Sequence, residues 1–220
     1  MVDRFSIATP AGDVSAAWHD ADGPALVVAH GAGAGMEHPL LDGFAHAIAE
    51  ARVATYRFNF LYVERAKKAP DREPLLREAW LAAFADASSR AGDHPVLAGG
   101  KSLGGRIASM CVADGMPAAA LVFLGYPLHA PGKPGSARAA HLERIHVPML
   151  FVQGTRDALA NLREIEPVIE RLGDRATLER VDGGDHSFKV PGPKVDPAQV
   201  GAALAGVVSR FVRRIAKDGR

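Results

Sequence analysis

One pentapeptide limits the fold of this chain more than any other feature, namely Gly100-Lys101-Ser102-Leu103-Gly104. It follows the apolar run Val96-Leu97-Ala98 and precedes helix-forming residues, so we predict a sharp turn from a strand into a helix. In such a G-x-S-x-G turn the glycines remove Cβ atoms that would clash, and the serine is lifted clear of the sheet. The amide of Leu103 then starts the helix, where it can donate a hydrogen bond to a developing oxyanion.

Two glycine-rich segments partly match nucleotide-binding loops. Gly100-Lys101-Ser102 matches the end of G-x-x-x-x-G-K-[ST], but Pro95 stands at the first glycine of that pattern. Gly31-Ala32-Gly33-Ala34-Gly35 begins like G-x-G-x-x-G, but the third glycine falls on Met36. Because both patterns are incomplete, we expect no nucleotide-binding loop and no cofactor.

An aspartate and a histidine follow two later strand candidates. Asp157 lies just after the apolar run at 148–153, and His186 lies after the alternating segment at 176–181. Parallel α/β sheets gather such strand-end loops at one edge, so we expect both residues to meet Ser102 there. The chain order Ser, Asp, His is one of three known orders of the serine triad. Asp182 and Asp185 are nearer to His186 in sequence, but their glycine-rich surroundings indicate turn residues.

The three residue types have separable roles in acyl transfer. Because a serine hydroxyl is a poor nucleophile, His186 is expected to accept its proton during attack and to return it to the leaving group. Asp157 would orient the imidazole and stabilise the imidazolium. A second oxyanion donor is expected from the amide of Ala32, in the glycine-rich loop that follows the buried strand candidate at 26–29. That loop also serves as a tight strand-to-helix turn.

Several separated segments together resemble the α/β-hydrolase superfamily, from about Leu26 to the end of the chain. They are HGAGAG at 30–35, YRFNF at 56–60, GGKSLGGRIAS at 99–109, LGYPLH at 124–129, FVQGTRD at 151–157 and GGDHSF at 183–188. The chain is most similar to a small lidless branch related to dienelactone hydrolases, which includes testis-expressed and chromatin-complex hydrolase-like proteins. Dienelactone hydrolases themselves carry cysteine at the elbow where this chain has Ser102, which argues against dienelactone as the substrate.

The order of apolar and helical segments agrees with that resemblance. A hairpin is expected from 5–9 and 14–19, then strands near 26–29, 53–58, 95–99, 119–124, 148–153 and 176–181. Helices are expected near 38–51, 73–91, 103–114, 161–172 and 197–217. This alternation predicts one α/β domain over residues 1–220, with a mostly parallel sheet of about eight strands covered by helices on both faces. The breaker-rich segment at 131–136 leaves no room for a cap domain.

Charge and composition exclude several other functions. A formal net charge of +1 gives no electrostatic reason to expect nucleic acid or an anionic membrane as a partner. No apolar run is long enough to span a bilayer, and the N-terminal residues open no long apolar segment. The lone Cys111 can form no internal disulfide. A cytoplasmic location is therefore the expectation, and the oligomeric state stays open.

The remaining histidines form no ligand pattern for a metal, so no metal is expected. Surface or helix-capping roles are predicted for His38, His46, His94, His141 and His146.

Some residues are candidates for the substrate pocket because they lie at strand ends or in the glycine-rich loop. They are Gly31, Gly33, Arg57, Lys101, Tyr126 and His129. Arg57 and Lys101 would bind a substrate carboxylate or else form a structural ion pair. His129 is expected to line the pocket or to face solvent, because its own strand-end loop supplies no carboxylate.

These observations predict a serine hydrolase that cleaves an ester or thioester of a small molecule through an acyl-enzyme intermediate. The alternative is a binding or assembly protein that keeps the fold with little or no turnover. Esterase, thioesterase, lactonase and acyltransferase share one nucleophile and differ in pocket shape, so the motifs do not separate them.

Overall fold

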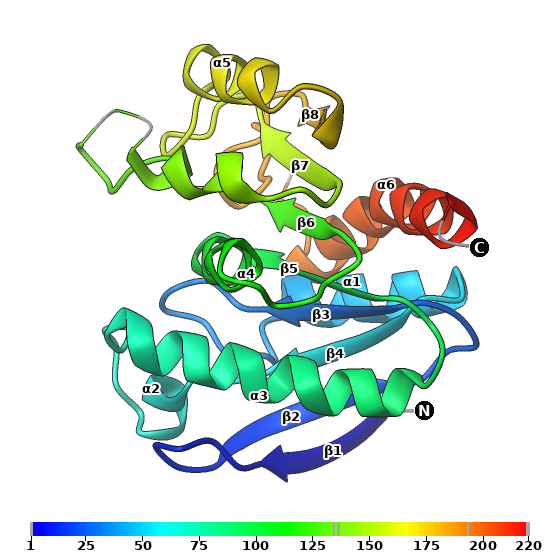
Figure 1. Ribbon diagram of the computed structural model, residues 1–220. Coiled ribbons are helices and arrows are strands. Elements are labelled where there is room, and N and C mark those ends of the chain that lie inside the picture. Colours follow the sequence, from blue (N-terminus) through cyan, green and yellow to red (C-terminus); the bar gives the residue numbers. More distant parts are fainter. Residues whose placement is uncertain (1, 134, 136, 193, 219–220) are drawn as a thin grey trace.

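The computed structural model describes residues 2–133, 135, 137–192 and 194–218. Its strands form one eight-stranded sheet in the order β1-β2-β4-β3-β5-β6-β7-β8 (Figure 1). They are β1 (Val2–Ile7), β2 (Val14–His19), β3 (Ala25–Ala29), β4 (Ala54–Phe58), β5 (Val96–Lys101), β6 (Leu121–Leu124), β7 (Met149–Gly154) and β8 (Ala176–Val181). β2 pairs antiparallel with β1 and β4, and every pairing from β4 to β8 is parallel. The expected single-domain α/β architecture is confirmed.

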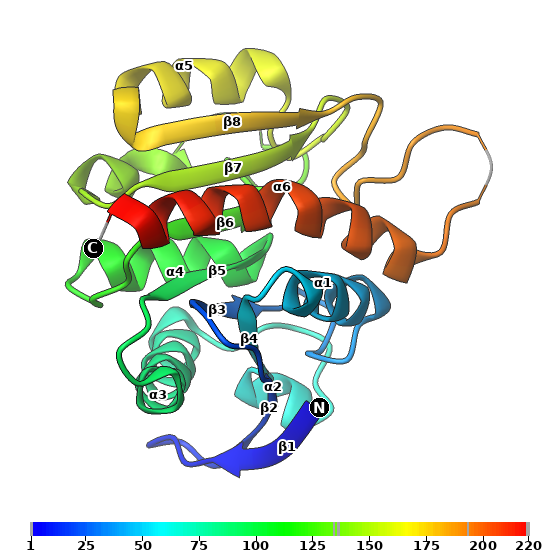
Figure 2. The ribbon, with the colours of Figure 1, turned by 90° about the vertical axis from the view of Figure 1, so that its right-hand side faces the viewer.

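Helices cover both faces of this sheet. They are α1 (Pro39–Glu50), α2 (Leu61–Glu64), α3 (Glu73–Ala91), α4 (Leu103–Ala113), α5 (Leu162–Leu172) and α6 (Pro197–Asp218), with short 3-10 helices at Ala137–Arg144 and Gly173–Arg175. Figure 2 shows α1 and α6 side by side on one face, with α3 and α4 on the other. The sheet between them is therefore buried on both sides, as parallel sheets require.

The alternation of side chains in β3 explains how this strand holds the two layers together. Leu26 and Val28 pack into the cluster that contains residues of α1 and α6. Val27 and Ala29 belong to the opposite cluster, which contains residues of α3, α4 and α5. Burying each of the larger side chains contributes about 1.5–3 kcal/mol. A strand with both faces buried is a rigid base for the loops at its end.

Differences from the expected elements are small and local. The strand predicted at 119–124 begins only at Leu121, and the short helix α2 was not predicted. Between β6 and β7 the described residues contain only the 3-10 helix Ala137–Arg144, so no cap domain covers the sheet there. Pro134 and Ser136, part of the breaker-rich segment, lie outside the described residues.

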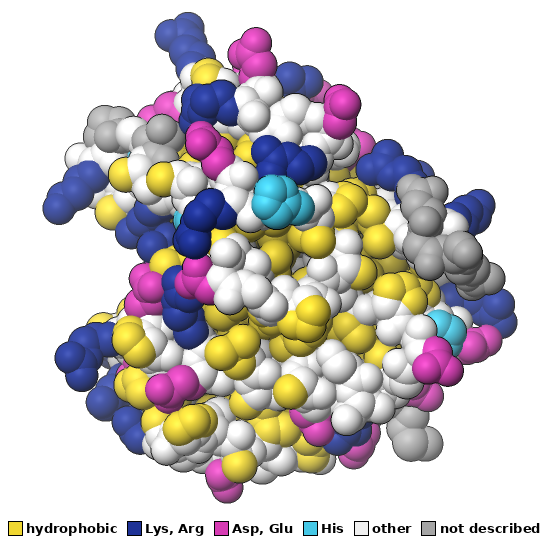
Figure 3. Space-filling view, in the orientation of Figure 1, with side chains coloured by type: hydrophobic (Ala, Val, Ile, Leu, Met, Phe, Trp, Pro, Cys, Tyr) yellow, Lys and Arg dark blue, Asp and Glu magenta, His cyan; other side chains and the backbone are white. Residues whose placement is uncertain are grey.

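The surface carries charges of both signs. In Figure 3 acidic and basic side chains are spread around the margin of the visible face, and its middle is mostly apolar or uncharged. Within the described ranges, no helix has both the length and the apolar character needed to cross a membrane.

Candidate active site

The turn between β5 and α4 holds Ser102 in a strained backbone conformation. Its φ is 50° and its ψ is −112°, a positive-φ conformation that costs a non-glycine residue on the order of 1–3 kcal/mol. A Cβ at Gly100 or Gly104 would collide with the backbone oxygen of Ala29 on the neighbouring strand. Glycine at these two positions therefore allows the tight turn, which directs the Ser102 hydroxyl away from the sheet.

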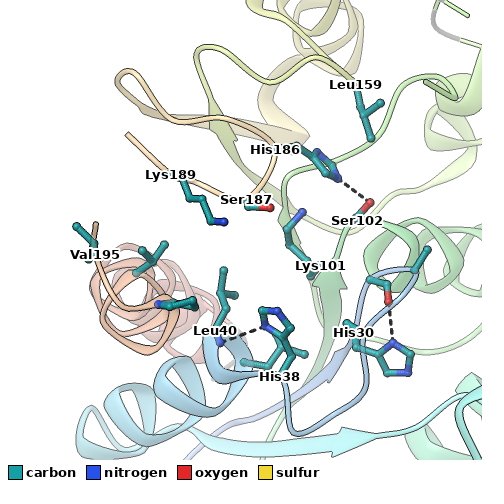
Figure 4. Close-up of a pocket in the computed structure, with 16 residues that line it drawn as sticks. His30, His38, Leu40, Lys101, Ser102, Leu159, His186, Ser187, Lys189 and Val195 are labelled. Carbon is teal, nitrogen blue, oxygen red and sulfur yellow. Dashed lines mark hydrogen bonds between the residues drawn. The ribbon is translucent and has the colours of Figure 1, made fainter. Parts of the chain in front are cut away.

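Ser102, His186 and Asp157 form one hydrogen-bonded chain. The Oγ of Ser102 lies 2.8 Å from Nε2 of His186, and Nδ1 of His186 lies 2.7 Å from Oδ2 of Asp157 (Figure 4 shows the Ser102–His186 bond). Because a carboxylate can only accept, Nδ1 carries the proton and Nε2 accepts from the hydroxyl. The three loops predicted to converge at the strand ends therefore bring these side chains into contact.

The carboxylate of Asp157 is buried and held by two further donors. Nε2 of Gln153 lies 2.6 Å from Oδ2, and the amide of Leu159 lies 2.8 Å from Oδ1. Its side chain is 0 % exposed, whereas that of His186 is 25 % exposed. Sequence reasoning missed Gln153, although its place at the end of β7, four residues before the aspartate, was a usable signal.

The two rival aspartates lie outside this chain of bonds. Oδ1 of Asp185 accepts from the amides of Ser187 and Lys189 at 2.7 and 2.9 Å. Asp182 is exposed. The turn role predicted for Asp185 is confirmed, because its carboxylate closes the loop that carries His186.

The loop after β3 lies directly against the elbow. A Cβ at Gly31 would lie 3.6 Å from Cβ of Ser102. The carbonyl of Gly31 accepts from the amide of Ala34 at 3.3 Å and from the hydroxyl of Tyr62 at 3.4 Å. Within the described part of the chain, the amides of Ala32 and Leu103 donate to no acceptor. Neither of the two predicted oxyanion donors is therefore engaged by an acceptor in the described residues.

The His30 ring holds this loop in place through hydrogen bonds to two backbone groups. The amide of Phe60 donates to its Nε2 at 3.2 Å, so the proton resides on Nδ1, which lies 2.8 Å from the carbonyl oxygen of Gly31. The ring is fully buried, and burial lowers the pKa of His30 to about 4. A neutral imidazole that bridges β3 and the segment after β4 was not expected from sequence, although its place directly after a buried strand was a signal.

A cavity of about 340 Å³ opens next to Ser102. Figure 4 shows its walls, which come from the loop after β3, the start of α1, the elbow, the His186 loop and the start of α6. The lining residues are His30, Gly31, Ala32, Ala34, His38, Leu40, Leu41, Lys101, Ser102, Leu159, His186, Ser187, Lys189, Val195, Pro197 and Val200. Of the pocket candidates from sequence, Gly31 and Lys101 are in this lining, and Gly33, Arg57, Tyr126 and His129 are not.

Arg57 and Tyr126 are held in the protein interior. Arg57 is 1 % exposed, and its Nη1 lies 3.1 Å from Oδ1 of Asp42 and 3.0 Å from the carbonyl oxygen of Met36. The structure thus places Arg57 in the ion-pair alternative. The hydroxyl of Tyr126 donates to the carbonyl of Arg138 at 2.7 Å, and its ring is 1 % exposed. Both residues brace the loops behind the site.

His129 neither faces solvent nor lines the cavity beside Ser102, and a carboxylate from another element contacts its ring. Its Nε2 lies 3.3 Å from Oε1 of Glu164, at the start of α5, and its Nδ1 lies 2.8 Å from the carbonyl oxygen of Ala130. His129 itself is only 8 % exposed. The partner comes from a different element, 35 residues away in sequence, which inspection of the residue's own loop could not reveal.

Two cationic residues and a histidine line one side of the cavity. Burial lowers the pKa of Lys101 to about 8, and the carboxylates of Asp157 and Asp185 partly oppose that shift. Nδ1 of His38 accepts from the amide of Leu40 at 3.2 Å, which confirms the predicted capping role. Sequence reasoning missed Lys189, although its place three residues after His186 was a usable signal.

In the described ranges, no group of three or more His, Cys, Asp or Glu side chains is arranged to hold a metal ion.

Comparison of structures shows that this fold is shared over nearly the whole chain. A protein of Xanthomonas campestris described as an α/β serine hydrolase without a lid has a TM-score of 0.75 and 18% identity, covering 97% of this chain and 94% of its own. A dienelactone hydrolase from Anabaena variabilis has a TM-score of 0.74 and 18% identity, covering 97% of each chain. A cold-adapted esterase from an Arctic intertidal metagenomic library has a TM-score of 0.69 and 14% identity, covering 95% of this chain and 93% of its own.

Sequence comparison agrees with the structural one. The profile of the alpha/beta hydrolase domain family matches residues 22–215, which include the elbow, both predicted oxyanion donors, Asp157 and His186. Since this match spans most of the chain and the fold agrees with it, the chain belongs to the α/β hydrolase domain family, as the resemblance of its motifs predicts.

Proposed function

We propose that this protein is a serine hydrolase that cleaves an ester or thioester through an acyl-enzyme intermediate. The observation that carries the proposal is the unbroken bond chain from the Ser102 hydroxyl through His186 to Asp157, with distances of 2.8 and 2.7 Å. Such distances are within the reach that proton transfer needs. The amides of Ala32 and Leu103, which donate to no acceptor in the described residues, support the proposal because both are expected near the same hydroxyl.

In the acylation step, Oγ of Ser102 attacks the carbonyl carbon of the substrate while Nε2 of His186 takes the hydroxyl proton. The new C–O bond converts the carbonyl oxygen to an oxyanion, which the amides of Ala32 and Leu103 stabilise. The carboxylate of Asp157 stabilises the imidazolium. The bond to the alcohol or thiol then breaks, and His186 donates its proton to that leaving group.

Deacylation repeats these roles with water as the nucleophile. His186 takes a proton from water, the hydroxide attacks the acyl carbon, and the bond to Oγ of Ser102 breaks as the serine regains a proton. No cap covers the cavity in the described residues, so water and product reach the acyl-enzyme directly.

The descriptions of proteins that share this fold support the proposal of an ester substrate. One of them is described as an esterase and another as a dienelactone hydrolase. Since this chain carries a serine nucleophile, we propose a small acyl ester or thioester as its substrate.

The proposal is tested with a fluorophosphonate probe, which reacts with activated serines. We expect Ser102 to be labelled, and Ser102→Ala to abolish labelling and to lower kcat/KM on 4-nitrophenyl esters by on the order of 10⁴–10⁶. Ser187→Ala is the matched control, because Ser187 lines the same cavity but is bonded to no histidine. It should retain labelling.

Labelling that survives in Ser102→Ala, with an unchanged melting curve, would contradict the proposal. A protein that is folded but neither labelled nor active on esters of any chain length would instead favour the binding or assembly protein.

A further inference from the structure

The side chains that line the cavity beside Ser102 give it a positive charge. Lys101, Lys189 and His38 contribute to its lining, and among the residues that the structure describes no aspartate or glutamate does. The whole protein is almost neutral, with a formal net charge of +1. The positive lining is therefore a local property of this cavity.

The three side chains approach a common space from different elements. Lys101 comes from the end of β5, Lys189 from the loop after His186, and His38 from the segment that starts α1. Figure 4 shows the amino groups of Lys101 and Lys189 on either side of Ser187. Burial lowers the pKa of His38, and the charges of Lys101 and Lys189 lower it further, which agrees with their proximity.

Neighbouring carboxylates are already engaged elsewhere. Asp157 accepts from His186 and Gln153, and Asp185 accepts from two backbone amides. In the part of the chain that the structure describes, neither Lys101 nor Lys189 forms an ion pair with a side chain. Lys101 is half-buried, and an ammonium in that position without a bonded anion is costly unless a ligand supplies the charge, whereas Lys189 is exposed.

His38 adds a hydrogen-bond donor to the same wall. Because its Nδ1 accepts from the amide of Leu40, the neutral ring carries its proton on Nε2. The positive end of the α1 dipole lies behind it, since the helix begins at Pro39. This wall therefore offers two ammonium groups and one N–H donor.

Resting on the hydrolase function proposed above, we propose that the substrate is a short ester or thioester carrying a carboxylate, which Lys101, Lys189 and His38 bind. The cavity of about 340 Å³ is near the lower end of typical ligand sites, which range over about 300–1,000 Å³. A short dicarboxylic half-ester is of suitable size for it. Nucleophile and anion site share one cavity, so a carboxylate a few bonds from the scissile carbonyl reaches both.

The test compares charged and uncharged substrates of equal length. For the acyl side, the pair is the 4-nitrophenyl half-ester of glutarate and 4-nitrophenyl valerate. For the alcohol side, the pair is 4-acetoxybenzoate and its methyl ester. We expect one pair to show a kcat/KM ratio of about ten in favour of the anion, which decreases in 1 M salt because bulk ions screen the attraction.

Variants then assign the preference to the cavity. Lys101→Met and Lys189→Met should each reduce the ratio severalfold. Lys194→Met is the matched control, because it removes the same charge from the same loop region and Lys194 does not line this cavity. It should leave the ratio unchanged. Using a ratio cancels any general effect of Lys101 on its neighbour Ser102.

A ratio near one in both pairs, or a ratio unaffected by both cavity variants, would overturn the anion site while leaving the hydrolase intact. If Ser102 is neither labelled nor active, the proposed hydrolase fails separately. Calorimetric titration with glutarate, which needs no turnover, then decides the site. Saturable binding that is lost in Lys189→Met supports it, and no binding overturns it.

Discussion

Two histidine–carboxylate pairs lie at the same edge of the sheet, and only one of them has the geometry for catalysis. His186 and Asp157 are joined at 2.7 Å, and His129 and Glu164 at 3.3 Å. In both pairs the histidine follows one strand and its carboxylate follows another. By residue types alone, the two pairs are equivalent.

The second ring nitrogen separates them. Nε2 of His186 lies 2.8 Å from the hydroxyl of Ser102, whereas Nδ1 of His129 lies 2.8 Å from the carbonyl oxygen of Ala130. A carbonyl oxygen has no proton to give, so His129 has nothing to deprotonate. Glu164 also accepts from the amide of Asn161 at 3.1 Å, which caps α5. The second pair therefore fastens α5 to the loop after β6.

Replacing each histidine gives the largest contrast between the pairs. His186→Ala should lower kcat/KM on a 4-nitrophenyl ester by on the order of 10⁴–10⁶, because the general base is lost. His129→Ala should change it by less than about threefold, because His129 does not line the cavity. Steady-state kinetics with melting curves as the folding control measures both. A comparable loss in the two variants would break the distinction.

The carboxylates give the next largest contrast. Asp157→Asn should lower kcat by about 10⁴, since an amide favours the wrong imidazole tautomer. Glu164→Gln and Asp185→Asn should retain most activity, because neither carboxylate bonds His186. Turnover of all three variants under the same conditions checks this ranking. Equal losses for Asp157→Asn and Asp185→Asn would remove Asp157 from the role that we propose.

Among the described residues no carboxylate bonds His30, and burial is the main influence on its pKa. Its pKa is lowered from 6.5 to about 4, so below pH 6.5 the unfolded chain binds a proton that the folded one does not. The neutral ring's contribution to stability is therefore present above pH 6.5 and is lost as the pH falls toward about 4, by about 3 kcal/mol.

Urea unfolding at pH 7 and pH 4.5 measures this effect. In His30→Gln the free energy of unfolding should fall less with acid than in the unsubstituted protein. An NMR titration of the His30 ring gives the same answer if the variant does not fold. A ring that is protonated at pH 5.5 in the folded protein would refute the prediction.

Much of the fold and three central residues of the site could be predicted because their signals are local. Ser102 lies in a turn whose glycines are needed within five consecutive residues. Asp157 and His186 each follow a strand candidate directly. Parallel strands end at one edge of the sheet. Placing each residue in the loop after its strand was therefore enough to predict that the three residues meet.

The cavity and the supporting contacts were not predictable in this way. His38 lines the cavity from the segment before α1, far from Ser102 in sequence, and it carries no motif. Arg57 lies near the end of the buried strand β4, as a binding residue would, and only the position of Asp42 on α1 shows that it is paired.

The sequence by itself determined the succession of strands and helices along the chain, the elbow and the candidate nucleophile, because backbone geometry and hydrophobic alternation act over a few residues. Tertiary structure decided which histidine reaches Ser102, which cations remain without a carboxylate, and which walls enclose the cavity. These properties depend on distances between segments far apart in the chain. A change of a few ångströms there separates a general base such as His186 from a structural residue such as His129.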